Sequence, residues 1–185
     1  MSDRHQGASL TTDGPPRAAL IAAIGVALAA IAAVLVLAVA SRQPTQQRPV
    51  VIPALPAPQA SSADCQRLLE ALPLRLGDYQ RVTPVEPVPQ GAAAWQKPGA
   101  DDPVVLRCGL DRPAEFVVGA PIQVVDAVQW FRVSDAGRST WFAVDRPVYV
   151  ALTLPPGSGP TPLQQLSEII TKTLVAQPIR PGPPS

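Results

Sequence analysis

Side chains able to perform acid–base or nucleophilic chemistry are scarce in this sequence. The only histidine, His5, precedes a long apolar segment, so the larger remainder of the chain has no imidazole for a general base or a catalytic triad. The two lysines, Lys97 and Lys172, are not accompanied by a Ser-x-x-Lys or Gly-x-Ser-x-Gly motif. We therefore predict no catalytic residue, and we consider an enzyme the less favoured class of protein.

Carboxylates are the alternative source of chemistry, and Asp101, Asp102 and Asp111 form the densest acidic group. A glycosidase needs two carboxylates at a set separation. Aspartates are more often solvated members of loops, because their side chains stabilise turns. The competing hypothesis is a histidine-free hydrolase or transferase that acts on envelope carbohydrate. No Asp-x-Asp-x-Asp-Gly loop for calcium occurs, and the sequence predicts no metal site and no cofactor.

Three tryptophans, Trp95, Trp130 and Trp141, are the candidate binding surface. Aromatic rings can contact sugar rings or a partner protein, although they more often belong to a core or to cross-strand pairs. In extended strands Trp130 and Phe131 point to opposite faces of a sheet, and Trp141 and Phe142 do the same. One member of each pair must therefore face away from a single core, where it is either covered or exposed.

The two cysteines, Cys65 and Cys108, both follow the apolar segment. Neither lies in a Cys-x-x-Cys motif or near a histidine, so a metal site or redox motif is not indicated. We predict a disulfide bond between them, with two separate buried thiols as the alternative. A disulfide requires an oxidising compartment, which places the C-terminal part of the chain outside the cytoplasm.

The apolar segment runs from Ala18 to Ala40 without a charge, a proline or an amide. At about 1.5 Å per residue, a helix of this length spans roughly 35 Å, more than the roughly 30 Å hydrocarbon core of a bilayer. The segment therefore predicts one transmembrane helix, and the membrane is the first predicted partner.

A cleaved signal peptide is the alternative, because Ala38-Val39-Ala40 before Ser41 has the small-x-small pattern of a cleavage site. The apolar run is longer than the about 7 to 15 residues typical of a signal peptide, so we favour a signal anchor. The flanking arginines hardly determine the orientation, since both sides of the helix carry them. Either alternative exports the rest of the chain.

Three segments of biased composition surround these elements. Residues 1–17 have hardly any apolar side chain and predict a disordered cytoplasmic tail. Residues 41–63 contain five prolines, which favour an extended linker that acts as a stalk. The tail 177–185 is again proline-rich and is expected to be unstructured. Residues 64–176 remain as the extracytoplasmic domain.

This domain is predicted to be α+β. A helix capped by Asp64 or Ser62 carries Cys65 on its apolar face and ends before Pro73. A second helix has Thr161 as its cap and Pro162 at its first position, and it repeats apolar residues at helical spacing. Between the helices we expect four to five antiparallel strands, of which the clearest are residues 103–108, 127–133, 139–145 and 148–154. The predicted fold is a small antiparallel sheet with an N-terminal and a C-terminal helix, preceded by one transmembrane helix.

Several short motifs follow one another between Asp64 and Val175. They are Cys65 before a Leu-Pro helix end, Trp95 near Pro98, and Arg107-Cys108-Gly109 with Pro113. In this order they resemble an actinobacterial family of small membrane-anchored or secreted proteins that is catalogued as a domain of unknown function, DUF3515. That family often has glycine after the tryptophan, where this chain has Gln96, and the stretch 98–103 is longer here.

The resemblance implies an actinobacterial source, paired cysteines and an envelope location, and it implies no reaction. The outer region is close to neutral and offers no footprint for nucleic acid. We therefore expect a non-enzymatic binding or accessory module of the cell envelope, anchored in the cell membrane with its N-terminus in the cytoplasm. Its partner would be an envelope protein or a cell-wall component, bound through the sheet face or through aromatic loops.

Overall fold

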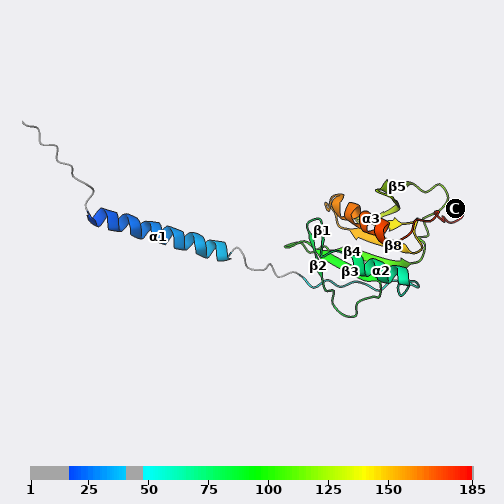
Figure 1. Cartoon of the computed structure of the whole chain (residues 1–185), viewed down its shortest axis with the longest axis horizontal. Coiled ribbons are helices and arrows are strands. Elements are labelled where there is room, and N and C mark those ends of the chain that lie inside the picture. Colours follow the sequence, from blue (N-terminus) through cyan, green and yellow to red (C-terminus); the bar gives the residue numbers. More distant parts are fainter. Residues whose placement is uncertain (1–16, 41–47, 185) are drawn as a thin grey trace, which may run out of the picture. The chain divides into compact units, whose positions relative to one another are not determined.

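A computed structural model of the chain describes residues 17–40 and 48–184, with the side chains of the first segment described from 21 to 37 (Figure 1). The chain divides into two units, residues 1–44 and residues 45–185, and each is described by itself. The predicted cytoplasmic tail lies outside the described residues, except for Arg17 at the start of the first helix.

Helix α1 (Arg17–Ala40) is 24 residues long and is the only element of the first unit in the described part of the chain. Its described side chains are small or apolar, and all of them are exposed. Within the part of the chain that the structure describes, no helix meets the combined length and hydropathy of a membrane span.

The second unit is built on one antiparallel sheet of eight strands in the spatial order β1-β2-β3-β4-β8-β7-β6-β5. The strands are β1 (Arg75–Leu76), β2 (Tyr79–Val82), β3 (Ala92–Gln96), β4 (Val104–Leu110), β5 (Ile122–Val125), β6 (Val128–Asp135), β7 (Arg138–Ala143) and β8 (Tyr149–Leu154). The first four strands form one meander and the last four form another. The two meanders join in the middle of the sheet, where β4 pairs with β8.

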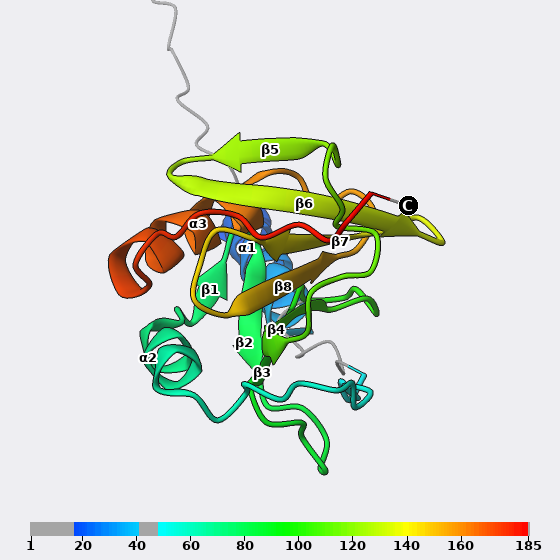
Figure 2. The same cartoon turned by 90° about the vertical axis from the view of Figure 1, so that its right-hand side faces the viewer.

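Helices α2 (Ala63–Ala71) and α3 (Thr161–Thr173) cover the same face of this sheet (Figure 2). Helix α2 begins at Ala63, and of the two predicted caps Ser62 is the one used, since its hydroxyl accepts a hydrogen bond from the backbone N–H of Cys65 at 3.3 Å. The predicted cap of helix α3 is wrong: Thr161 is its first residue, and Pro160 holds the N-cap position without a side-chain hydrogen bond. Pro162 lies in the first turn, where a missing N–H costs nothing. The apolar stripes of both helices and the alternate residues of the strands form the main core.

The α+β class and the two flanking helices are confirmed, but the sheet is larger than the predicted four to five strands. The four clearest predicted strands are β4, β6, β7 and β8. The missed strands are short, and β3, with the sequence Ala-Ala-Ala-Trp-Gln, consists mainly of a residue type that is depleted in strands. Pairing with longer neighbours, which local patterns do not reveal, makes these segments strands.

The predicted disulfide between Cys65 and Cys108 is confirmed. It joins α2 to the central strand β4, and both cysteines are fully buried in the main core. Its Cα atoms are 5.6 Å apart, within the usual range for a disulfide.

The segment predicted as a proline-rich stalk, residues 41–63, differs from the expectation over its described part. Val50 and Ile52 are 5% and 3% exposed and pack on Ala94 and Val105, on the sheet face opposite the helices. The backbone N–H of Gln59 donates to the carbonyl of Gly109 at 3.0 Å. Prolines prevent a ladder but not apolar packing, so this extended segment covers part of the sheet.

The tail predicted to be unstructured, residues 177–185, is also packed over its described residues. The backbone N–H of Gly182 donates to the carbonyl of Phe116 at 2.8 Å, and Gly182 in turn accepts from Val118 at 3.0 Å. Ile179 joins a second small core with Phe116 and Phe131. The tail therefore covers the β6–β7 side of the face opposite the helices.

Removing the disulfide should destabilise the domain strongly, because it closes a loop with a sequence separation of 43 residues. We expect the double substitution Cys65→Ser and Cys108→Ser to lower the free energy of unfolding by about 4 kcal/mol. Urea unfolding of the full chain in detergent measures this change. Adding a reductant to the double variant is the control and should have no further effect, and a loss below about 1 kcal/mol would contradict the prediction.

Gly109 should tolerate no side chain, since it has a φ of +86° and a Cβ there would press against the backbone of Gln59 and Ala60. Gly119 is the matched control, with a φ of +89° and nothing within 4 Å of its Cβ position. We expect Gly109→Ala to cost about 1 to 3 kcal/mol more than Gly119→Ala in urea unfolding, because overpacking adds to backbone strain. Equal losses would show that the close approach does not matter.

Candidate ligand-binding groove

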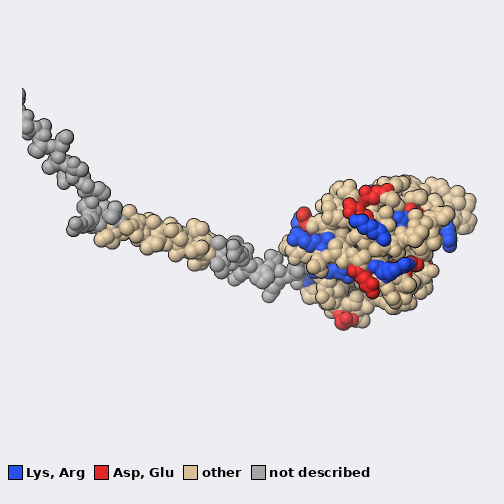
Figure 3. Space-filling view, viewed as in Figure 1, with Lys and Arg blue, Asp and Glu red and all other residues tan. Residues whose placement is uncertain are grey.

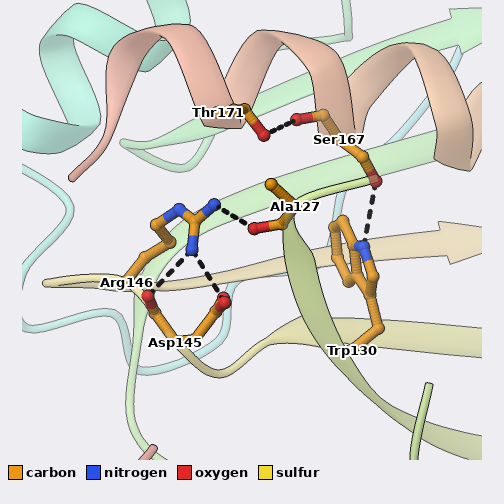
Figure 4. A network of polar contacts seen from close by, with 6 residues as sticks. All are labelled: Ala127, Trp130, Asp145, Arg146, Ser167 and Thr171. Carbon is orange, nitrogen blue, oxygen red and sulfur yellow. Dashed lines mark hydrogen bonds and ion pairs between the residues drawn. The ribbon is translucent and has the colours of Figure 1, made fainter. Parts of the chain in front are cut away.

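The three predicted tryptophans do not share one surface. Trp95 and Trp130 are fully buried in the main core. The indole N–H of Trp95 donates to the carbonyl of Pro73 at 3.0 Å, and that of Trp130 donates to Ser167 Oγ, also at 3.0 Å (Figure 4). Both rings therefore have their polar atoms satisfied inside the domain. Of the three, Trp141 alone reaches the surface.

Trp141 lines a cleft of about 460 Å³ beside the loop 155–160. The guanidinium of Arg132 lies over its ring, 5.4 Å from the centroid, and donates to Ser139 Oγ at 2.8 and 3.1 Å. This arginine is thus already held by a ring face and a hydroxyl. Of the buried polar atoms without a partner in the described residues, none belongs to this cleft.

The predicted acidic residues lie at the surface. Asp101 forms an ion pair with Arg48 at 3.0 Å, and Asp102 forms one with Arg138. Asp111 is exposed. Among the described residues, no group of three His, Cys, Asp or Glu side chains could hold a metal ion. Two of the three carboxylates are therefore engaged by arginines rather than by each other.

Charges of both signs are mixed over the surface of the domain. On the face drawn in Figure 3, Lys and Arg side chains alternate with Asp and Glu side chains and are separated by uncharged residues. No large field of one sign is visible on that face. A ligand would therefore be selected by local groups rather than by the overall charge of the domain.

A groove crosses the sheet face opposite the helices. It consists of two hollows of about 290 and 390 Å³ that share Arg107 and Thr153, and we call it the sheet-face groove. Its floor is formed by the central strands β4, β8 and β7. Residues 49–55 and residues 113–115, which belong to no strand, also line it and form its walls.

The two halves of the groove differ in chemistry. The apolar half, the smaller hollow, is lined by Leu55, Leu110, Pro113, Glu115, Val133, Thr140, Phe142 and Ala151 beside the shared pair. The charged half, the larger hollow, includes Asp101, Asp102 and Arg138 together with residues 49–53. The hydroxyls of Thr140 and Thr153 on the floor lie 3.0 Å apart and bond to each other.

Arg107 lies where the two halves meet. Its neighbours in register, Ala92 on β3 and Ala151 on β8, are small and leave room for its side chain on the sheet. Its Nη2 donates to the carbonyl of Pro53 at 3.4 Å, a long hydrogen bond. Its Nε is buried without a hydrogen-bond partner. In the described part of the chain, no carboxylate comes within ion-pair distance of this guanidinium.

Burial lowers the pKa of the Arg107 guanidinium below its ordinary value, and burial is the only cause. A carboxylate close by would raise this pKa, because an opposite charge favours the charged form. An arginine nevertheless keeps its proton at every ordinary pH. The groove therefore holds a partly desolvated positive charge with no carboxylate of the described residues within ion-pair distance.

Arg146 provides the contrast within the same domain. Its side chain is 1% exposed and pairs with the Asp145 carboxylate at 2.8 Å, and it donates to the carbonyl of Ala127 at 2.8 Å (Figure 4). These bonds connect the turn after β7 to the turn before β6. Arg146 Nε also has no hydrogen-bond partner, so the two arginines differ in the carboxylate, which pairs with Arg146 and is absent beside Arg107.

The fold and the groove define an α+β domain with an antiparallel sheet, one disulfide and a groove that contains an arginine without a carboxylate partner. Residues 24–179 match the family model described as "Protein of unknown function (DUF3515)", and the chain belongs to this family, as the motifs around Cys65 and Arg107 predict. No curated protein matches the chain, and no solved structure does either. The actinobacterial source and the envelope location stay predictions.

Sequence reasoning identified Arg107 only as part of a motif and not as a binding residue. Its residue type alone does not indicate a binding role, because the sequence does not distinguish it from arginines that pair with carboxylates. The useful signal is positional: Arg107 lies in a strand between the apolar residues Leu106 and Cys108, where a charged residue must face the other side of the sheet. What it meets on that side depends on distant segments.

The different surroundings of Arg107 and Arg146 predict opposite effects of the same substitution. Arg107→Met should leave the free energy of unfolding unchanged or raise it by about 1 kcal/mol, because an uncompensated charge is removed. Arg146→Met should lower it by about 3 to 5 kcal/mol, because Asp145 stays buried without its counter-charge. Urea unfolding compares the two variants, and a large loss in Arg107→Met would mean that this arginine is structural.

Proposed function

We propose that this chain is a single-pass membrane protein whose domain outside the cytoplasm is a non-enzymatic binding module of the cell envelope. The module holds an anionic group of its ligand on Arg107 in the sheet-face groove. The observation that carries this role is the half-buried guanidinium that lines both hollows of the groove with no carboxylate of the described residues within ion-pair distance.

A partly buried positive charge without a counter-charge weakens the free domain, because no ion pair offsets its desolvation. A carboxylate or phosphate of a ligand, bound by the terminal nitrogens of Arg107, would supply that counter-charge through charge-assisted hydrogen bonds. Arginine suits such recognition better than lysine, because its planar fork can hold two oxygens of one anion. The groove is thus arranged for a ligand rather than for the stability of the domain.

Two observations support the anchored, exported arrangement. Helix α1 is 24 residues long, about 36 Å at the usual rise, and the sequence from Ala18 to Ala40 has no charged residue. Its described apolar side chains, such as Ile21 at 70% and Leu37 at 69% exposure, would be covered by lipid. The disulfide supports an oxidising compartment for the domain.

The structure gives less support to the alternative, a histidine-free hydrolase or transferase acting on envelope carbohydrate. Asp101 and Asp102 are exposed and paired with arginines, so neither is desolvated as a general acid would be. Asp102 also lines the charged half of the groove, where a role in ligand contact is compatible with its ion pair.

The anchor can be tested in cells that make the full chain. The protein should stay in the membrane pellet after carbonate extraction, and a variant lacking residues 18–40 should not, because it has lost the apolar helix. A C-terminal alkaline phosphatase fusion should be active, since that enzyme requires export. Release of the full chain by carbonate would refute the anchor, and release of a shortened chain starting near Ser41 would identify a cleaved signal peptide.

The anion site can be tested with simple salts. Sodium acetate, titrated at constant ionic strength, should shift the Arg107 Nε–H NMR signal of the full chain in detergent micelles until it saturates. Arg107→Gln removes the probe itself, so the backbone N–H signals of Ala151 and Thr153 serve as the second readout and should stop responding in that variant. Arg132→Gln, on the other face of the same sheet, is the matched control and should respond like the unmodified chain. Absence of a saturable shift in the unmodified chain would refute the site.

A further inference from the structure

We infer that the group bound by Arg107 is the C-terminal carboxylate of a peptide whose last side chain is apolar. This inference rests on the proposed function, because it names the ligand of the same groove. It follows from the order of the chemical groups along the groove, which is apolar, then cationic, then mixed in charge.

The apolar half lies directly beside the guanidinium. Leu110 and Ala151 are buried, and Val133 and Phe142 are half-buried, so a side chain placed among them would be largely removed from water. A volume of about 290 Å³ suits one medium-sized or large apolar side chain. The ligand therefore carries its apolar group within one residue of its anionic group.

The charged half disfavours two other anionic ligands. An acyl chain longer than the apolar half would have to continue past Arg107 into a hollow that contains Asp101, Asp102 and Arg138. Free phosphate has no apolar group for the apolar half and no peptide groups for the charged half, so it would use neither hollow fully. A peptide backbone, with its alternating N–H and C=O groups, can bond to carboxylates and to a guanidinium in the same hollow.

A C-terminal residue meets both requirements by itself, because its α-carboxylate and its side chain leave the same Cα atom. The carboxylate can accept two parallel hydrogen bonds from the Arg107 fork while the side chain enters the apolar half. Glu115 lines that half and is exposed. Its charge disfavours an acidic last side chain and weakens the carboxylate's attraction, so the site selects an apolar residue at the cost of some affinity.

The test uses the full chain in detergent micelles and fluorescein-labelled hexapeptides with four mixed positions, a fixed glycine and a C-terminal leucine. Fluorescence anisotropy should show binding of the free acid and at least tenfold weaker binding of the same peptides with a C-terminal amide. Arg107→Gln should weaken binding of the free acid at least tenfold, and Arg132→Gln should change it less than twofold. Glu115→Gln should strengthen it, because the competing negative charge is gone.

The outcomes separate this inference from the proposed function. Equal binding of acid and amide peptides would overturn the C-terminal carboxylate, even if both need Arg107. Binding of decanoate but not of the peptides, lost in Arg107→Gln, would also overturn it, while leaving an anion-binding module. Tighter binding of peptides ending in glutamate than of those ending in leucine would contradict the role of the apolar half. Failure of acetate and peptide alike would overturn both proposals.

Discussion

The disulfide between Cys65 and Cys108 fastens helix α2 to the central strand β4, and the residues on either side of Cys108 depend on this attachment. Cys108 faces the helices, so Arg107 must face the opposite side of the sheet. Gly109 bends the strand at a register shift and lets the backbone of residues 59 and 60 approach it closely. The start of α2 and the extended segment before it are thereby held at the same point of the sheet. One run of three residues thus fixes a helix, a wall of the groove and the cation on its floor.

The two faces of the sheet are covered in different ways, and the groove is a consequence. On the helix face, large side chains such as Trp95, Trp130 and Leu152 fill the space under α2 and α3. On the other face, Val105 and Arg107 of β4 lie beside Thr153 and Ala151 of β8, so this face is less apolar than the helix face. Extended segments cover its apolar positions around Val105 and around Phe131. The centre, where the side chains are small and polar, stays open.

Local patterns in the sequence predict the parts of this fold whose stability is local. Capping at Ser62 identifies α2, helical spacing after Pro162 identifies α3, and alternation along residues 148–154 identifies β8. The presence of only two cysteines, neither of them in a metal or redox motif, identifies the disulfide. Such patterns do not reveal the short strands. They also do not reveal that residues 48–62 and 177–184 cover the sheet, because prolines indicate that a segment cannot join a ladder but not whether it packs. The site escapes for the same reason: two walls from distant parts of the chain determine whether Arg107 has a partner.

A buried arginine can be retained for folding or for binding, and a carboxylate partner distinguishes the two cases. Arg146 is more deeply buried than Arg107, and its Nε likewise has no partner, but the Asp145 carboxylate and two backbone carbonyls bind its terminal nitrogens and so connect two turns. Arg107 has one long hydrogen bond to Pro53 and a buried Nε with none. A structural role would have favoured a carboxylate beside the guanidinium, and Glu115 lines the same hollow without forming an ion pair. The groove therefore keeps its cation free even though an acidic side chain is available nearby, which is the arrangement that a site for an external carboxylate requires.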